Sequence, residues 1–186
     1  MKTILTSIRV LLVLTILTGI IYPLIITGVS QVVFPDTANG SMLELHGRAV
    51  GFRMIGQAFA SDRYSWPRPS AIGYNPMPSG GSNLGPISTT LRDSVEMRAM
   101  KFGVPVKDIP ADLLLASGSG LDPDISPEAA AFQIDRVVKA RKLAETERPR
   151  IVSLVQSHIR YPQFGLLGEP RVNVLELNLA LDSLLP

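Results

Sequence analysis

The apolar run from Val10 to Pro35, which holds no charged residue, dominates the hydrophobic pattern of the chain. Crossing a bilayer core of roughly 30 Å takes about 20 apolar residues, because a helix rises about 1.5 Å per residue. The run is long enough even if its polar end, Ser30-Gln31, lies among the headgroups. The pattern therefore predicts one transmembrane helix over about residues 7–33.

Two other interpretations compete with a retained anchor. A cleaved signal peptide would have a shorter apolar core followed by a small-residue cleavage site, which Phe34-Pro35-Asp36 does not match. A buried helix of a globular protein would carry a polar stripe, and we find none between Val10 and Val29. Length and flanking residues therefore favour an anchor that stays in the membrane.

The charges on either side of this helix indicate its orientation. Lys2 and Arg9 precede it, and no Lys or Arg follows until Arg48. The positive-inside rule then places the N-terminus in the cytoplasm. We expect a single-pass membrane protein, with residues 1–35 forming the anchor segment and residues 36–186 forming one domain on the outer, periplasmic or extracellular, side.

Small and hydroxyl residues recur at a spacing of four along the anchor. Such a ribbon lets a second helix approach closely, and a proline frees a carbonyl that a neighbour can satisfy. The plainer alternative is that Gly and Pro are simply frequent in membrane helices. We favour a docked partner helix against the ribbon residues Thr15, Gly19, Pro23 and Thr27.

Residues 36–186 alternate between periods typical of strands and helices, which predicts the α+β class. A hairpin is expected over 42–45 and 49–55, with His46 and Gly47 in its turn, and the apolar run 113–116 is typical of a buried strand. Helices are expected from Ser88 and from Ser126, both as N-caps. Their predicted inner residues are Leu91, Val95, Ala99, Phe102, Ile134, Val137 and Val138; their predicted outer residues are Arg92, Glu96, Arg98, Arg136, Lys139, Arg141 and Lys142.

Two more amphipathic helices are expected toward the C-terminus. One carries Ile151, Leu154 and Val155 inside, with His158 as a hydrogen-bonded structural residue at its end. The last helix is expected to begin with Asn173 as its N-cap. A strand that begins at Arg171 is the alternative for the start of this segment. Its predicted inner residues are Val174, Leu177, Leu181 and Leu184.

Residues 56–87 have no helical or strand period and are dense in Gly, Pro, Ser and Asn. Loops longer than about 12–15 residues are uncommon in compact domains unless they are functional or disordered. Disordered segments are usually poor in aromatic residues, whereas this one contains Phe59, Tyr64, Trp66 and Tyr74. We therefore predict a long ordered Gly/Pro-rich loop pinned by aromatic packing.

Composition narrows the possible functions. The net charge of +2 includes no basic block, so the sequence does not indicate nucleic-acid binding. Because the chain has no cysteine, it can form neither disulfides nor thiolate metal sites. His46 and His158 are the two imidazoles, and two isolated histidines are weak evidence for a metal site, so we expect neither a metal centre nor catalytic residues.

Two Gly/Ser turns are the remaining candidates for chemistry. Ser119 lies in a segment similar to a nucleophile elbow, but the leading glycine of that motif is missing. Glycine-rich turns can also present backbone N–H groups to a phosphate, although no P-loop sequence is present. A membrane-anchored nucleotide-binding or hydrolytic protein therefore stays open as the alternative function, and tight structural turns are the favoured interpretation. The weak nucleotide-binding candidates are Gly80, Gly81, Ser82, Ser117, Gly118, Ser119 and Gly120.

Five motifs together carry a resemblance to a known family: GQAF (56–59), RPSA (68–71), SGGSNLGP (79–86), ASGSGLDPDISPEAA (116–130) and EPRVNVLELNLAL (169–181). In this order and spacing they resemble the C subunit of bacterial Kdp potassium-transporting ATPases. The resemblance covers nearly the whole chain. The loop residues that carry it are Gly56, Gln57, Arg68, Pro69, Ser70, Ser82, Asn83, Gly85, Pro86, Asp122 and Pro123.

The resemblance implies a non-catalytic accessory subunit of an ATP-driven, high-affinity potassium uptake complex. Its implied partners are a channel-like subunit that selects K⁺, a P-type ATPase subunit and a small single-span subunit. ATP and K⁺ would be ligands of the complex, and no cofactor is assigned to this chain. The family is described as a catalytic chaperone that raises the ATP affinity of the ATPase subunit. Since the predicted topology keeps the domain away from cytoplasmic ATP, we expect that influence to pass through the anchor helix.

The same resemblance suggests a place for the outer domain beside the ion entrance of the channel-like subunit. Loop carbonyls and the carboxylates of Asp122 or Asp124 could raise the local concentration of cations there.

Overall fold

The computed structural model describes residues 2–45 and 47–184, which form two compact units over residues 1–50 and 51–186. The first unit begins with a continuous helix made of α1 (Lys2–Ile16), a π-helical turn η1 (Leu17–Ile21) and α2 (Tyr22–Val33). Within the described residues, the Lys2–Val33 helix is the one with the length and apolarity to cross a membrane. It begins five residues before the expected start at residue 7 and ends where the sequence predicted.

The π turn ends at Ile21, two residues before Pro23, which lies in the first turn of α2. The amide of Tyr22 donates to the carbonyl of Leu17, five residues earlier. A proline removes one backbone donor and its ring crowds the preceding turn, and a π turn is one way for a helix to accommodate this. The chain thus stays helical through Pro23.

A short helix α3 (Pro35–Ala38) and a two-stranded sheet follow the long helix. The strands are β1 (Met42–Leu45) and β2 (Arg48–Phe52), so the predicted hairpin is confirmed, with its second strand ending earlier than expected. Gly47 has a φ of 73°, as its place in the turn requires. His46, predicted to lie in that turn, is outside the described residues.

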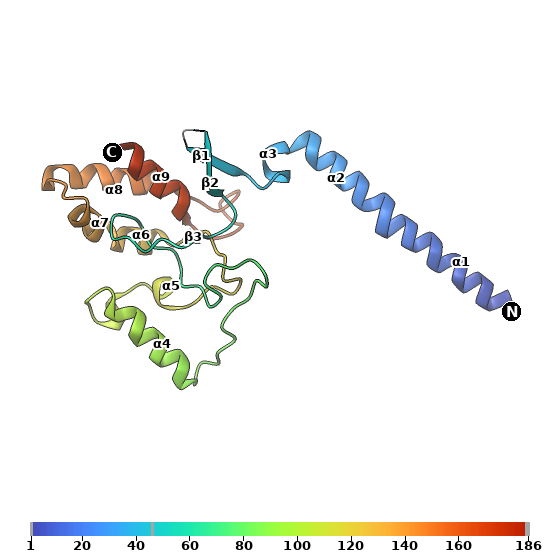
Figure 1. Ribbon diagram of the computed structural model, residues 1–186, viewed down its shortest axis with the longest axis horizontal. Helices are drawn as coiled ribbons and strands as arrows, with labels where there is room; N and C mark the ends of the chain where they lie inside the picture. Colours follow the sequence, from blue (N-terminus) through green and yellow to red (C-terminus); the bar gives the residue numbers. More distant parts are fainter. Residues whose placement is uncertain (1, 46, 185–186) are drawn as a thin grey trace. The chain divides into compact units, whose positions relative to one another are not determined.

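The second unit combines helices with a small antiparallel sheet, in agreement with the α+β expectation (Figure 1). Its sheet has the order β3-β5-β4, and Val172 at its centre lies opposite both Ile125 and Ile159. Its strands are β3 (Asp124–Ile125), β4 (Ile159–Arg160) and β5 (Arg171–Asn173). Its helices are α4 (Thr89–Met100), η2 (Val106–Asp108), α5 (Ala111–Leu114), α6 (Pro127–Phe132), α7 (Ile134–Ala140), η3 (Glu145–Glu147), α8 (Arg148–Ser157) and α9 (Val174–Leu184).

Three helix starts predicted from capping residues are confirmed. The Ser88 and Ser126 hydroxyls accept from the amides three residues later, at 3.4 and 3.0 Å. The side-chain Oδ1 of Asn173 accepts from the Glu176 amide at 3.1 Å and caps α9, while Asn173 also ends β5. The strand and the helix that were alternatives for this segment therefore both form, one after the other.

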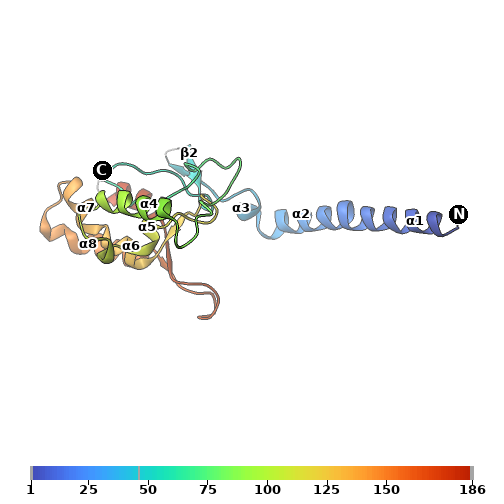
Figure 2. The same ribbon diagram turned by 90° about the horizontal axis from the view of Figure 1, so that it is seen from below.

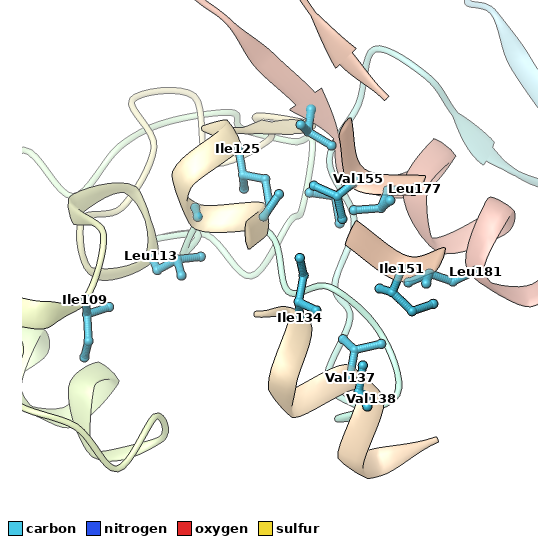
Figure 3. Packing of buried hydrophobic residues seen from close by; sticks show 14 of the residues in the cluster. Ile109, Leu113, Ile125, Ile134, Val137, Val138, Ile151, Val155, Leu177 and Leu181 are labelled. Atoms are coloured by element: carbon cyan, nitrogen blue, oxygen red, sulfur yellow. The ribbon is translucent and has the colours of Figure 1, made fainter. Parts of the chain in front are cut away.

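The core lies between α6, α7, α8 and α9 and one face of the sheet (Figure 3). Figure 3 shows Ile134, Val137 and Val138 close to Ile151 and Leu181. All five were predicted to face inward, and all are buried. The prediction that Leu184 faces inward is wrong, because this residue is 37% exposed at the end of α9.

Two further predictions are wrong. Residues 113–116 do not form a strand, because Leu113 and Leu114 close the short helix α5 and the chain then becomes extended. Both leucines are buried, and a short apolar run does not by itself distinguish a strand from a helix. Arg98, Arg136 and Arg141 do not face solvent, because each guanidinium binds backbone carbonyls inside the domain.

Candidate functional site

The two Gly/Ser turns, far apart in the sequence, lie against each other in the structure. The Ser119 carbonyl accepts from the Gly80 amide at 2.9 Å and from the Ser79 hydroxyl at 2.8 Å. Around this contact, residues 56, 68–72, 79–81 and 117–122 form what we call the loop junction. It gathers motif residues from four separate segments of the chain, which makes it the candidate functional site.

Close backbone packing explains several glycines of the loop junction. A Cβ on Gly120, whose φ is +70°, would lie 2.7 Å from the Gly80 carbonyl oxygen and would collide with Ile72. A Cβ on Gly81 would lie 3.0 Å from the Gly118 oxygen, and one on Gly56 would collide with the backbone of Asp122. These positions need glycine because another backbone occupies the space of a side chain.

Four backbone amides of the loop junction are bonded within the protein. Besides the Gly80 amide, the Ser117 amide donates to the Pro69 carbonyl at 2.9 Å, and the Gly56 amide donates to the Leu121 carbonyl at 2.7 Å. The Leu121 amide donates to the hydroxyl of Ser119, the candidate nucleophile, at 3.1 Å. Because these four amides are engaged, they are not available to a phosphate, which favours structural turns at Gly80 and Ser117.

The RPSA segment is held by its own side chains. The Ser70 hydroxyl accepts from the amides of Ile72 and Tyr74 at 3.2 and 2.9 Å. The Tyr74 hydroxyl donates to the Arg68 carbonyl at 2.6 Å, and burial raises the pKa of Tyr74 to about 12. This phenol therefore stays protonated at neutral pH and acts as a fixed donor.

The acidic residues beside the loop junction are paired with arginines. Arg68 Nη1 lies 2.9 Å from Asp122 Oδ2, and Arg171 Nε lies 2.9 Å from Asp124 Oδ2. Burial is the main cause that raises the pKa of Asp124, and the Asn173 amide and Arg171 partly oppose it. Carboxylates neutralised by arginines do not concentrate cations, so the expectation that Asp122 or Asp124 attracts K⁺ loses its support.

Buried side-chain amides fix the aromatic loop onto the helices. Gln133 accepts from the Trp66 amide at 2.7 Å and donates to the Trp66 carbonyl at 3.1 Å. Asn178 does the same for Ser65, at 2.8 and 3.0 Å. Each side chain thus satisfies a loop backbone as a neighbouring strand would, which supports the prediction that this loop is pinned around Ser65 and Trp66.

Two arginines that were predicted to face solvent also hold the aromatic loop on the helices. The Arg136 guanidinium stacks 3.8 Å from the centre of the Trp66 ring, and burial lowers its pKa to about 10. Arg141 donates to the Arg63 carbonyl at 2.8 Å and pairs with Asp182 at 2.7 Å. Sequence reasoning missed both because helical spacing cannot show that a distant loop covers a helix face.

A hollow of about 640 Å³ lies between this loop and α4. Two cationic side chains line it: Arg98 of α4, and Lys101, which follows α4. Arg98 donates to the Leu114 carbonyl at 2.5 Å. Burial lowers the pKa of Arg98. The hollow is lined by Ala58, Phe59, Ala60, Asp62, Trp66, Pro67, Pro69, Ser70, Tyr74, Arg98, Lys101, Phe102 and Leu113.

The remaining candidate residues lie elsewhere. Ser82, Asn83, Gly85 and Pro86 are exposed and lead toward α4. His158 is the structural residue predicted, with Nδ1 2.8 Å from the Leu154 carbonyl. Within the described residues, no three His, Asp or Glu side chains come together as a metal site.

Two more motif residues and the anchor ribbon are also accounted for. The Gln57 side chain packs against Gly51, and the Pro123 carbonyl accepts from the Val174 amide at 3.0 Å. In the anchor, a Cβ on Gly19 would lie 4.0 Å from the Thr15 methyl, so the helix itself leaves room at Gly19. Pro23 and Thr27 follow on the same helix.

Comparison with known proteins shows the family to which the chain is related. The family model described as K⁺-transporting ATPase, c chain, matches residues 4–183. A potassium-transporting ATPase KdpC subunit of Paraburkholderia phytofirmans is 53% identical over 158 residues, which cover 81% of each chain. The corresponding subunits of Burkholderia vietnamiensis and Burkholderia mallei are 52% and 50% identical over 81% of this chain and 80% of theirs. The chain therefore belongs to the KdpC family, the c chain of K⁺-transporting ATPases.

Proposed function

We propose that this chain is a non-catalytic accessory subunit of an ATP-driven, high-affinity potassium uptake complex in a bacterial inner membrane. The observation that carries the proposal is the match to the c chain, because it runs over residues 4–183 and so includes both the apolar helix and the domain. The partners are a channel-like subunit that selects K⁺, a P-type ATPase subunit and a small single-span subunit.

The helix Lys2–Val33 anchors the chain in the bilayer with its N-terminus in the cytoplasm. Support comes from its apolarity and from Lys2 and Arg9 at its start, where the positive-inside rule expects them. None of its described side chains is buried within the chain. An entirely exposed helix suits contact with lipid on one side and with a partner helix along the Thr15–Thr27 ribbon on another.

The domain on the far side of the membrane acts as a rigid support for the channel-like subunit, beside its ion entrance. Rigidity is supported by the loop junction, in which Gly80, Ser117 and Gly56 donate their amides to other loops. A surface organised in advance binds a partner without the entropic cost of ordering loops. In this arrangement the subunit stabilises the assembly and does not itself take part in ATP hydrolysis.

Coupling to ATP use passes through the anchor. The domain and cytoplasmic ATP lie on opposite sides of the membrane, so a direct contact between them is not part of the proposal. A helix that packs differently against two states of its partners changes their equilibrium, and through it the affinity for ATP. The anchor therefore has to contact its partners specifically.

Deletion of residues 36–186 tests the role of the domain. We expect the shortened chain to reach the membrane but to lose co-purification with its partner subunits and high-affinity K⁺ uptake. Normal assembly and uptake with the anchor alone would refute the proposed role of the domain.

A matched pair of anchor variants tests the ribbon. Gly19→Leu places a large side chain on the ribbon, whereas Gly28→Leu adds the same side chain where nothing lies within 4 Å. We expect Gly19→Leu to reduce assembly severalfold and Gly28→Leu to leave it unchanged. Equal behaviour of the two variants would argue against a partner helix on this face.

A further inference from the structure

The connection between β4 and β5 projects from the domain as a hairpin with an apolar end. Figure 2 shows this segment, in brown, extending below the helices. We call residues 161–168 the apolar finger; they include no charged residue. Its large side chains are exposed by 71% at Tyr161, 92% at Phe164, 85% at Leu166 and 62% at Leu167.

The backbone of the finger is fixed by its own hydrogen bonds. Gln163 and Leu167 pair as an antiparallel bridge, with the Gln163 amide 2.9 Å from the Leu167 carbonyl and the return bond at 3.0 Å. The Gly165 amide donates to Pro162 at 3.1 Å, and Phe164 and Gly165 have φ values of 55° and 73°. The finger therefore presents its side chains in one defined arrangement.

Exposure of these side chains has a cost that folding of the domain does not explain. Burying a large apolar side chain is favourable, yet these four side chains remain exposed to water. Contiguous apolar patches on soluble surfaces usually mark interaction sites. A rigid tip with an aromatic residue at its end is typical of the anchors that dominate the energetics of protein interfaces.

Charges at the base of the finger favour a protein partner over a lipid surface. A loop that inserts among anionic headgroups usually brings free cations with it. Here Arg160 lies 2.5 Å from Glu176, and Arg171 lies 2.9 Å from Asp124, so both arginines are already paired. A fixed tip also has more value against a shaped protein recess than against fluid lipid.

We propose that the apolar finger inserts into an apolar recess on the channel-like subunit of the K⁺-transporting ATPase. The inference rests on the proposed function, because it takes the domain to be held against a partner chain. It adds the surface by which the domain is held, with Phe164, Leu166 and Leu167 as the inserted side chains and Tyr161 at the rim.

Photo-crosslinking in native membranes tests the proposal with the complete complex. A benzophenone analogue of phenylalanine placed at Phe164 should form an adduct with the channel-like subunit of the ATPase on irradiation. The same analogue at Lys139, an exposed position on α7, should form none. Adducts from position 164 that contain only lipid, or no adduct at all, would overturn the proposal.

A second test removes the apolar character of the finger without disturbing its fold. Phe164→Asn with Leu166→Gln suits it, because asparagine tolerates a left-handed backbone. We expect about tenfold or greater loss of co-purified partner subunits, with the unfolding midpoint of the isolated chain unchanged. The control Met77→Gln changes another exposed apolar residue, 80% exposed in the loop 56–87, and should assemble normally.

The outcomes separate this inference from the proposed function. Normal assembly of the finger variant, together with lost assembly on deletion of residues 36–186, would refute the finger and leave the accessory role in place. Normal assembly in both cases would refute both. Loss of assembly with the Met77 control as well would also count against the finger, since any exposed apolar residue would then have the same effect.

Discussion

Gly120→Ala is the sharpest test of the loop junction, because the neighbouring Gly118→Ala is a matched control. Gly120 has a φ of +70°, and a Cβ there would lie 2.7 Å from the Gly80 carbonyl oxygen and collide with Ile72. Around Gly118, by contrast, nothing lies within 4 Å of the added carbon. The two variants add the same methyl group two residues apart in one turn.

The expected loss of stability in Gly120→Ala follows from three terms. An alanine in the left-handed region costs about 1–2 kcal/mol. Overpacking against a fixed backbone costs about 1–3 kcal/mol more. Alanine also reduces the conformational freedom of the unfolded chain, which offsets about 0.4–1 kcal/mol of this loss. Gly120→Ala should therefore lower the free energy of unfolding by about 2–4 kcal/mol, whereas Gly118→Ala should change it by no more than about 1 kcal/mol.

Unfolding of the full chain in detergent, followed by fluorescence, measures this difference. Trp66 is the single tryptophan, and its ring lies 5.4 Å from that of Phe102 and beneath Arg136, so its emission reports on the loop. At roughly 3–4 °C per kcal/mol for a domain of this size, Gly120→Ala should lower the midpoint by roughly 6–16 °C. Equal midpoints for the two variants would refute the close packing of the two turns.

Three further predictions concern single side chains. Arg136→Met should lower the free energy of unfolding by about 2–3 kcal/mol, because it removes the stack on Trp66 and the bonds to loop carbonyls. The exposed control Lys139→Met should lower it by less than about 0.5 kcal/mol. A loss below about 1 kcal/mol for Arg136→Met would contradict the stack. Burial raises the pKa of Asp124 above its ordinary value of 3.8, so the folded state binds this proton more tightly than the unfolded state does. The contribution of Asp124 to the free energy of unfolding therefore falls as pH rises from about 4 through the folded-state pKa. The free energy of unfolding of the wild type minus that of Asp124→Asn, measured by urea titration at a series of pH values, should therefore decrease over that interval; a difference that increases would refute the assignment. Ser119→Ala should leave K⁺ uptake by the complex within about twofold of wild type, and a loss of uptake with normal assembly would revive the nucleophile hypothesis.

Local signals were sufficient for much of the helical part of the fold. Ser88, Ser126 and Asn173 could be recognised as caps because a cap depends on residues within one turn of it. The apolar faces around Ile134 and Leu177 followed from helical spacing alone. In both cases the information lies within a few residues of the element that it specifies.

The parts that could not be predicted depend on contacts between distant segments. The strands β3 and β4 have two residues each and gain their identity only by pairing with β5. Arg136 faces inward because the loop around Trp66 covers it, and no local pattern contains that contact. Long side chains such as arginine can also cross an apolar surface to reach buried carbonyls.

The loop junction shows the same limit for the candidate site. Both Gly/Ser turns were recognised as unusual, yet their contact through Ser119 and Gly80 requires the whole domain. Family resemblance selected the residues that meet there, whereas only the structure shows that Gly56 and Gly120 are needed for space. The exposed finger was not singled out at all, because a short apolar loop has no period to recognise.

The central claim is that the Lys2–Val33 helix spans the membrane and holds the domain on the far side. Because the native chain has no cysteine, Ser157→Cys in an exposed position of α8 gives a single label site. A membrane-impermeant maleimide applied to intact cells should label Cys at position 157, while Thr3→Cys at the other end of the helix should be labelled only after permeabilisation. The reverse pattern, with position 3 labelled in intact cells and position 157 protected, would contradict the account.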